Sequence, residues 1–356
     1  MKRRPLVKVI KRFHGAYQWV RYGVNHTLGA YRRDIAIDGD ATRLGENICI
    51  FSIYSANGKI LRSTLSLLKA IRKEGYGLVV VVNGQKITRG WFEGELGTTD
   101  VVISRPNLGR DFAAYQTATN LVLDSKLSLC RLLYCNDSVF YLDRNDPSNI
   151  FAHLVCSDDQ WIGMTETYEH RYHVSSWCFQ LSKEVLQSPA FVEFWRHYRP
   201  VDSRRHAIRR GEIGLTNALL SAGYVPKVLF DAGNLLRMVL QKHDVRNHKR
   251  LLPEHWTLQP EMASPSGLNG VLKWLFEGEK LNQTNSLGIL LISEAGFPFI
   301  KKAMAFQSNC PISVILVILE ERMSGFCMEA ANEVRLKGMR RTASPWKRLL
   351  FDAGII

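Results

Sequence analysis

Between residues 46 and 232 the chain alternates short runs of β-forming apolar residues with longer amphipathic segments, and this alternation limits the fold more than any other feature. Residues 59–74 carry apolar side chains at a helical spacing, whereas residues 78–82 are apolar, mostly valine, and too few for a helix. A run so uniformly apolar is typical of a strand covered on both faces. The pattern therefore predicts an α/β fold with a doubly wound, mostly parallel sheet.

The same patterns give the expected elements and loops. The expected strands are residues 48–54, 78–82, 100–104, 129–134, 161–165, 177–181 and 224–230, and the expected helices are residues 59–74, 110–124 and a stretch around 189–222. After about residue 232 the alternation stops, and we expect loop over 241–263 followed by short helices over 268–340. Ligands of doubly wound sheets bind beyond the carboxyl ends of the strands, so a site is expected in the loops 54–58, 83–87, 105–111 and 135–140.

The excess positive charge is confined to the two ends of the chain. The formal net charge is +14, from 47 basic and 33 acidic residues. Residues 2–33 hold nine basic residues and residues 335–348 hold six, with no acidic residue in either segment. The remaining 32 basic residues are matched by the 33 acidic ones, so the body is close to neutral. This distribution argues against an RNA-binding surface on the body, and we expect no nucleic-acid partner.

The N-terminal segment also has an apolar stripe at helical spacing. It consists of Leu6, Ile10, Phe13, Tyr17, Val20 and Val24. A basic amphipathic helix with aromatic residues is typical of a segment that lies on an anionic lipid surface, but the alternative is a solvated arm that packs this stripe on the core. The segment lacks the continuous apolar core and cleavage site of a secretory signal. The later apolar run 312–319 is too short to span a bilayer.

Seven cysteines are scattered along the chain without a Cys-x-x-Cys pair, so neither a zinc ribbon nor a disulfide framework is indicated. Reduced thiols and basic ends together lead us to expect a cytoplasmic protein, peripheral on the inner face of the cytoplasmic membrane.

The first motif with chemical potential is the segment 107–115, Asn-Leu-Gly-Arg-Asp-Phe-Ala-Ala-Tyr. Gly109 lies in a bend after an expected strand, and Arg110 and Asp111 begin an expected helix. Asp111 is explained either as a carboxylate that offsets the helix dipole or as part of a phosphate-binding helix start beside an arginine.

The second motif, Asn136-Asp137-Ser138, directly follows the expected strand 129–134. All three residue types favour turns, and this is one explanation. The other is a contact with a sugar hydroxyl or with a diphosphate and its hard cation, which takes carboxylate oxygens.

Taken in order, the motifs resemble the rhamnan-synthesis F family of bacterial polysaccharide glycosyltransferases and, more distantly, inverting transferases with the GT-A fold. The resemblance begins with Asn107-x-Gly-x-Asp111 and Asn136-Asp-Ser138. It continues through Trp161-Ile-Gly163, Ser175-Ser-Trp-Cys-Phe-Gln180, Phe191-x-x-Phe-Trp195, Glu212-Ile-Gly-Leu-Thr216, Ala222-Gly-Tyr224 and Gly296-Phe-Pro-Phe-Ile-Lys301. It implies a GT-A-like catalytic domain over 46–232, preceded by a basic amphipathic arm over 1–45. A mainly helical region with a basic tail follows over 233–356.

The resemblance implies a donor site for a nucleotide sugar. The implied donor-binding residues are Tyr54, Ser55, Asn83, Asn107, Gly109, Arg110, Asp111, Asn136 and Ser138. Asn136-Asp-Ser138 stands where GT-A enzymes carry Asp-x-Asp, which holds a divalent ion on the diphosphate. One carboxylate is lost here, so Asp137 is the expected ligand of Mg²⁺ or Mn²⁺, and metal dependence is an open question.

The resemblance also implies the catalytic and acceptor residues. Glu212 matches the position of the base that takes the proton of the acceptor hydroxyl, although its spacing alone favours a surface helix carboxylate beside Arg209 and Arg210. Asp137 would support the departing diphosphate. Ser175, Ser176 and Trp177 would lie near the acceptor, and Trp177 is also a candidate for the core. Lys301 and Lys302 are candidates for phosphate contacts, whereas His170, His173, His197 and His206 fit no metal-ligand spacing.

The leading hypothesis is an inverting glycosyltransferase that moves a sugar, such as rhamnose, from a nucleotide diphosphate to a lipid-linked acceptor of a growing surface polysaccharide or lipopolysaccharide. The alternative hypothesis keeps the fold and makes the protein a non-catalytic saccharide-binding or assembly subunit.

Overall fold

The computed structural model of the chain describes residues 4–29, 34–55, 58–92, 94, 96–97, 100–146, 149–241, 282–307 and 311–338. Most of the expected loop 241–263, the first part of the expected helical region 268–340 and the basic tail beyond residue 338 lie outside the described residues.

A mostly parallel sheet forms the centre of the molecule, as the alternating pattern predicts. Its eight strands lie in the order β1-β4-β3-β2-β5-β10-β7-β11. They are β1 (Ala36–Asp38), β2 (Asn47–Tyr54), β3 (Gly77–Asn83), β4 (Val101–Arg105), β5 (Arg131–Asn136), β7 (Trp161–Gly163), β10 (Cys178–Ser182) and β11 (Lys227–Val228). The four central strands β4, β3, β2 and β5 are parallel, while β10 is antiparallel to both of its neighbours.

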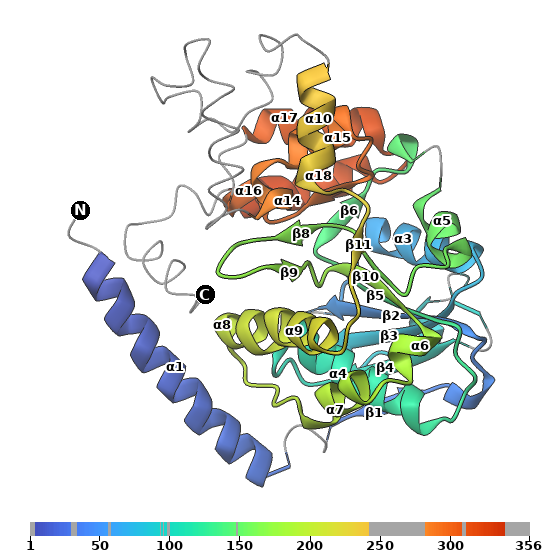
Figure 1. Ribbon diagram of the computed structural model, residues 1–356, viewed down its shortest axis with the longest axis vertical. Coiled ribbons are helices and arrows are strands. Elements are labelled where there is room, and N and C mark those ends of the chain that lie inside the picture. The colour runs from blue at the N-terminus through green and yellow to red at the C-terminus, as the bar shows by residue number, and fades with distance from the viewer. Residues whose placement is uncertain are drawn as a thin grey trace.

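Helices cover both faces of this sheet, so the doubly wound α/β class is confirmed (Figure 1). One face carries α4 (Arg110–Asp124), α6 (Lys183–Leu186), α7 (Pro189–His197) and α9 (Ile213–Ser221). The other face carries α3 (Arg62–Lys73), α5 (Ile150–Cys156) and the C-terminal helices. Side chains of β2 alternate between the two cores, with Phe51 in one and Ile50 in the other, and both are fully buried.

The C-terminal region is helical, as expected, and it shares the hydrophobic core of one sheet face. The helices among its described residues are α10 (Ala232–Gln241), α14 (Gln283–Ser286), α15 (Gly288–Glu294), α16 (Met304–Gln307), α17 (Ile312–Arg322) and α18 (Cys327–Gly338). The sequence pattern did not predict β12 (Phe299–Lys301), which pairs with β6 (Val139–Tyr141) directly after the motif at residues 136–138. This pairing brings the C-terminal region to the carboxyl end of β5.

The expected helical stretch 189–222 is interrupted. After α7 the chain forms a loop, a single turn α8 (Arg204–His206) and a π-helix η4 (Ala207–Glu212) that continues into α9. The remaining short elements are the hairpin strands β8 (Glu166–Thr167) and β9 (His173–Val174) and the 3₁₀ turns η1 (Ala41–Arg43), η2 (Arg89–Phe92) and η3 (Asp143–Asn145).

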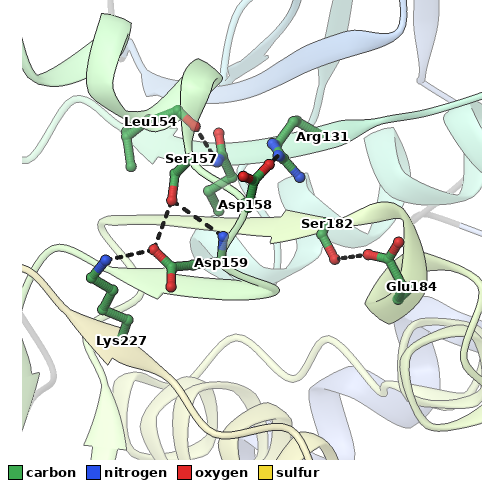
Figure 2. A network of polar contacts seen from close by, with 9 residues as sticks. Arg131, Leu154, Ser157, Asp158, Asp159, Ser182, Glu184 and Lys227 are labelled. Atoms are coloured by element: carbon green, nitrogen blue, oxygen red, sulfur yellow. Dashed lines mark hydrogen bonds and ion pairs between the residues drawn. The ribbon is translucent and has the colours of Figure 1, made fainter.

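The end of the sheet away from the expected ligand loops is held by a polar network (Figure 2). Lys227 of the edge strand β11 donates to Oδ2 of Asp159 at 2.7 Å, and Ser157 donates to the same oxygen at 2.7 Å. Nearby, the hydroxyl of Ser182 donates to Glu184 at the start of α6. These contacts fix the turns between strands, and they supply control positions remote from the site described below.

The N-terminal arm forms the long helix α1 (Arg4–Thr27), which lies at one side of the molecule outside the α/β body (Figure 1). No helix in the described part of the chain is long and apolar enough to cross a membrane.

Candidate functional site

The site lies where the order of the sheet reverses, between the carboxyl ends of β2 and β5. Ser52 of β2 and Asn136 of β5 are register partners at this point, and both are buried. Chain excursions to opposite sides of the sheet leave a crevice at such a switch point, and ligands of doubly wound folds bind there. Asp111, in the first turn of α4, accepts hydrogen bonds from Ser52 Oγ at 3.0 Å and from Asn136 Nδ2 at 3.4 Å. Two sequence motifs 25 residues apart therefore meet at one carboxylate.

The network continues along the strand ends toward β4. Asn83 Nδ2 donates to Ser52 Oγ at 3.2 Å, and Arg105 Nη1 donates to Asn83 Oδ1 at 2.6 Å. On the other side, Asn136 Oδ1 accepts from the backbone amide of Ser138 at 3.1 Å and from its hydroxyl. One continuous row of polar side chains thus links the carboxyl ends of four strands.

The loop before α4 has an unusual backbone that presents the helix start to the crevice. Gly109 has a φ of 77° and Arg110 a φ of 57°, so two consecutive residues are left-handed. A β-carbon at Gly109 would lie 2.5 Å from the carbonyl oxygen of Pro200, and hence only glycine fits. A strained non-glycine residue such as Arg110 persists only where the surrounding structure holds it, as at ligand sites. The amides of the first turn of α4 lack intrahelical partners and favour a bound anion.

The electrostatics of this cluster are unfavourable for its own carboxylate. Burial, together with the neighbouring carboxylates of Asp137 and Glu212, raises the pKa of Asp111 to about 6. The Ser52 hydrogen bond and Arg110 oppose it only in part. The ionised form of this carboxylate is destabilised in the free protein, so a cationic or hydroxyl-bearing ligand that stabilises the charge would bind favourably here.

Glu212 belongs to the helical segment between α8 and α9, about 100 residues after Asp111 in the sequence. It ends the π-helix η4, a wide helical turn that often occurs at functional sites. The preceding residue is Gly211, where a β-carbon would lie 2.6 Å from Cγ of the buried Phe112 in α4. Glycine therefore lets the π-helix approach α4 closely, and the approach sets the position of the Glu212 carboxylate.

The Glu212 carboxylate is held by two partners. The hydroxyl of Ser176 donates to Oε1, and Oε2 lies 3.3 Å from Nε2 of His173. The other ring nitrogen of His173 lies 2.8 Å from the carbonyl oxygen of Arg171, so it carries a hydrogen and fixes the ring. Burial alone would raise the pKa of Glu212, but His173, Ser176 and Lys301 outweigh burial, and the net pKa is lowered. Glu212 is therefore an ionised acceptor, and its side chain is 22% exposed.

A cation from the C-terminal region completes the cluster. Lys301 ends β12, whose pairing with β6 brings it over the strand ends. Burial lowers the pKa of this ammonium, while the carboxylates of Glu212 and Asp111 favour its charge. A positive group thus lies in the field of both the base candidate and the donor-side carboxylate.

The remaining predicted residues have different surroundings. Tyr54 is exposed at the end of β2, and Ser55 is buried with its hydroxyl bonded to the carbonyl of Lys59. Asn107 is exposed, and Ser175 is buried beside β9. Trp177 is only 3% exposed, so its ring lies in the core rather than on an open acceptor surface. It packs edge-on against Phe297 and Phe299, and its indole nitrogen donates to Thr165.

Three site residues were not selected by the sequence analysis. Ser52 lies inside β2 and Arg105 is the last residue of β4, so the available signal was a polar side chain within, or at the end of, a mostly apolar strand. His173 was grouped with the scattered histidines, because nothing local connects it with a glutamate 39 residues later. Its role depends on the contact between β9 and the region of η4.

The carboxylate oxygens at this site suit a metal ion that binds together with a diphosphate. Among the described residues there is no group of three or more His, Cys, Asp or Glu side chains placed to hold a metal ion. Asp137 and Asp111 are close enough to influence each other electrostatically. Magnesium is commonly held by one or two carboxylates together with substrate phosphates, and the residues present fit that arrangement.

Fold and site together define an α/β protein with a charged cluster at the switch point of its sheet. The family described as rhamnan synthesis protein F matches residues 78–255, half of the chain, and the chain belongs to this family. The resemblance to this family noted from the motifs is thereby confirmed.

Individual relatives are distant. The chain is 23% identical over 210 residues to the uncharacterized protein y4gN of Sinorhizobium fredii (strain NBRC 101917 / NGR234). That match covers 58% of this chain and 54% of y4gN, so the chain spans about half the length of the curated relative it matches. Among solved structures, the mannosyltransferase PcManGT from Pyrobaculum calidifontis, in complex with GDP-Man and Mn²⁺, is similar at 11% identity and a TM-score of 0.30, over 99% of this chain and 97% of that one.

Proposed function

We propose that the protein is an inverting glycosyltransferase that uses a nucleotide diphosphate sugar. The observation that carries this proposal is the position of an ionised, partly exposed Glu212 beside Ser176 and His173, close enough to Asp111 at the switch point to influence its pKa. Membership of a polysaccharide-synthesis family supports the same conclusion.

In the proposed reaction the donor lies over the strand ends. The first turn of α4 and Arg110 would bind the diphosphate. Asp111 would accept a hydrogen bond from a sugar hydroxyl, and Asn136 would donate one to the sugar. Tyr54, Ser55 and Asn83, at the ends of β2 and β3, would contact the nucleoside. Asn107, Gly109 and Ser138 would shape the two loops around it.

Glu212 would act as the general base. An acceptor hydroxyl placed near Ser176 would transfer its proton to the Glu212 carboxylate while its oxygen attacks the anomeric carbon. The bond from that carbon to the diphosphate oxygen breaks in the same step, which inverts the configuration. His173 would stabilise the ionised base before the reaction and hold its orientation.

Negative charge develops on the departing diphosphate, and Lys301 would stabilise it. Any Mg²⁺ or Mn²⁺ would be held by Asp137 and the diphosphate and would supply further neutralisation of that charge. The motif Asn136-Asp-Ser138 has lost one metal-binding carboxylate. Lys301, a protein cation in the electrostatic field of Asp111, would supply part of the positive charge that the metal ion otherwise provides.

The decisive experiment compares two glutamates that each accept a serine hydroxyl. Glu212→Gln should lower transfer by about 10²- to 10⁴-fold, the usual contribution of a general base. Glu184→Gln, whose partner Ser182 lies at the other end of the sheet, should leave transfer unchanged. Transfer is measured by mass spectrometry with a panel of nucleotide sugars. Equal activity of the two variants, with folding intact by circular dichroism, would refute the assignment of the base.

A second comparison tests the role of Lys301. Lys301→Met should lower kcat by about 10²-fold, as the loss of one charge-stabilising donor does. Lys183→Met, an exposed lysine at the start of α6, is the matched control. The assay is run with Mg²⁺ and with EDTA, since added metal should recover part of the lost rate. An unchanged kcat under both conditions would remove Lys301 from the mechanism.

The donor sugar is proposed to be rhamnose, as the family description of rhamnan synthesis suggests. The acceptor is proposed to be a lipid-linked saccharide of a surface polysaccharide or lipopolysaccharide. Donor screening with the wild-type protein tests the first of these two points. The absence of turnover for every donor, together with measurable saccharide binding, would favour the alternative of a non-catalytic assembly subunit.

A further inference from the structure

The helix α1 has two opposite faces with different surroundings. Its inner face contacts the body: Arg21 Nη1 lies 3.1 Å from Oδ2 of Asp202, and the rings of Trp19 and His206 meet edge-on at 5.3 Å between centroids. Gln18, on the same face, is buried. These contacts are polar or aromatic, and they leave the apolar stripe of the helix elsewhere.

The outer face carries that stripe. Phe13, Tyr17, Val20 and Val24, spaced by four, three and four residues, lie on one side of the helix. They are exposed, with 74% of Phe13 and 67% of Val20 accessible to solvent, and Val9 extends the row by one turn. The alternative in which the stripe packs on the core is therefore excluded for these residues. An exposed apolar row of this length requires an occupant.

Charge identifies the class of the occupant. Residues 2–33 contain nine basic residues and no acidic one, while the rest of the chain between the basic ends is nearly neutral. Among these residues Arg12 is exposed next to the stripe. A surface that is both apolar and positive matches the interface of a bilayer with anionic headgroups, where apolar side chains enter the acyl boundary and basic ones remain at the phosphates.

We propose that the outer face of α1 binds an anionic phospholipid membrane. The contact also has a consequence for the site. Asp202, the partner of Arg21 on α1, lies 4.0 Å from Nε of Arg110 at the start of α4. The membrane-bound helix is thus adjacent to the loop at the switch point, and the protein would lie with this crevice near the lipid surface.

The test uses the full-length protein and vesicles of two compositions. Vesicles with equal parts of phosphatidylglycerol and phosphatidylcholine should bind the wild-type protein in co-sedimentation, and vesicles of phosphatidylcholine alone should bind it much less. The double variant Phe13→Ser/Val20→Ser should bind the anionic vesicles at least about tenfold more weakly, because two apolar side chains no longer enter the interface. Arg12→Gln should weaken binding by about fivefold, which corresponds to the loss of one basic contact.

The chain offers a matched control. Val225 and Met328 are 77% and 66% exposed on the body, close to the values for Phe13 and Val20. Val225→Ser/Met328→Ser should bind the anionic vesicles like the wild type, and none of these exposed substitutions should change the thermal midpoint. Equal binding by both double variants, or equal binding to the two lipid compositions, would overturn the proposal. So would self-association that depends on the stripe, seen by light scattering, without vesicle binding.

This inference is independent of the catalytic proposal. Hydrolysis of a soluble nucleotide sugar should be the same in Phe13→Ser/Val20→Ser and the wild type, whereas vesicle binding should differ. A protein that binds vesicles through α1 and shows no turnover would refute the proposed function and leave the membrane surface in place.

Discussion

Replacement of Asp111 by asparagine should stabilise the fold at pH 8 and destabilise it at pH 4. The carboxylate is partly buried, and burial together with Asp137 raises its pKa from 3.8 to about 6. The unfolded chain releases this proton near pH 4 and the folded chain near pH 6, so the folded state holds more protons between these values. Stability is therefore lost as the pH rises from about 4 to about 6, and the full cost is present above pH 6.

The size of the effect follows from the shift and the hydrogen bonds. A shift of about two units corresponds to about 3 kcal/mol at neutral pH, which asparagine removes because it carries no charge. Asparagine can still accept from Ser52 Oγ with its oxygen, but its amide nitrogen would face the donor Nδ2 of Asn136. That lost bond costs about 1 kcal/mol. The variant should be about 2 kcal/mol more stable than the wild type at pH 8 and about 1 kcal/mol less stable at pH 4.

Urea unfolding in EDTA, followed by circular dichroism at pH 4, 6 and 8, measures the difference in the free energy of unfolding. Asp159→Asn is the control of opposite sign. Its pKa is lowered chiefly by the hydrogen bond from Lys227, so this variant should lose stability at neutral pH and approach the wild type in acid. A loss of stability in Asp111→Asn that is the same at all three pH values would refute the reasoning about burial.

Two further substitutions test the support of the base. Gly211→Ala should destabilise the fold by about 1–3 kcal/mol in urea unfolding and lower transfer, because its β-carbon would meet the Phe112 ring at 2.6 Å; Gly214→Ala, whose nearest contact is 3.4 Å, should be neutral or stabilising. Equal stabilities would show that η4 adapts without cost. His173→Gln should move the acidic limb of the kcat/KM profile to higher pH, since the histidine lowers the pKa of Glu212 and the base must be ionised to act. An unmoved limb would mean that another group controls it.

Local sequence determined the strands and helices of the α/β body and the polar residues at the ends of its strands. The valine run became β3, and the helix expected over residues 110–124 is α4 with the same bounds. Asn136 and Asp111 were selected because each lies at the carboxyl end of a strand or the start of a helix. Periodicity of two and of 3.6 residues is a local property, so it specifies strands, helices and their buried faces without knowledge of the partners.

Tertiary structure alone decided which of these residues meet. Lys301 reaches the site through a three-residue strand that pairs with β6, about 160 residues earlier, and so short a run has no distinctive local pattern. His173 and Glu212 meet because a hairpin packs beside a π-helix, and the direction of the α1 stripe depends on which face finds polar partners on the body. Contacts over such separations depend on strand order and packing. Residue types and local periodicity do not encode either one directly.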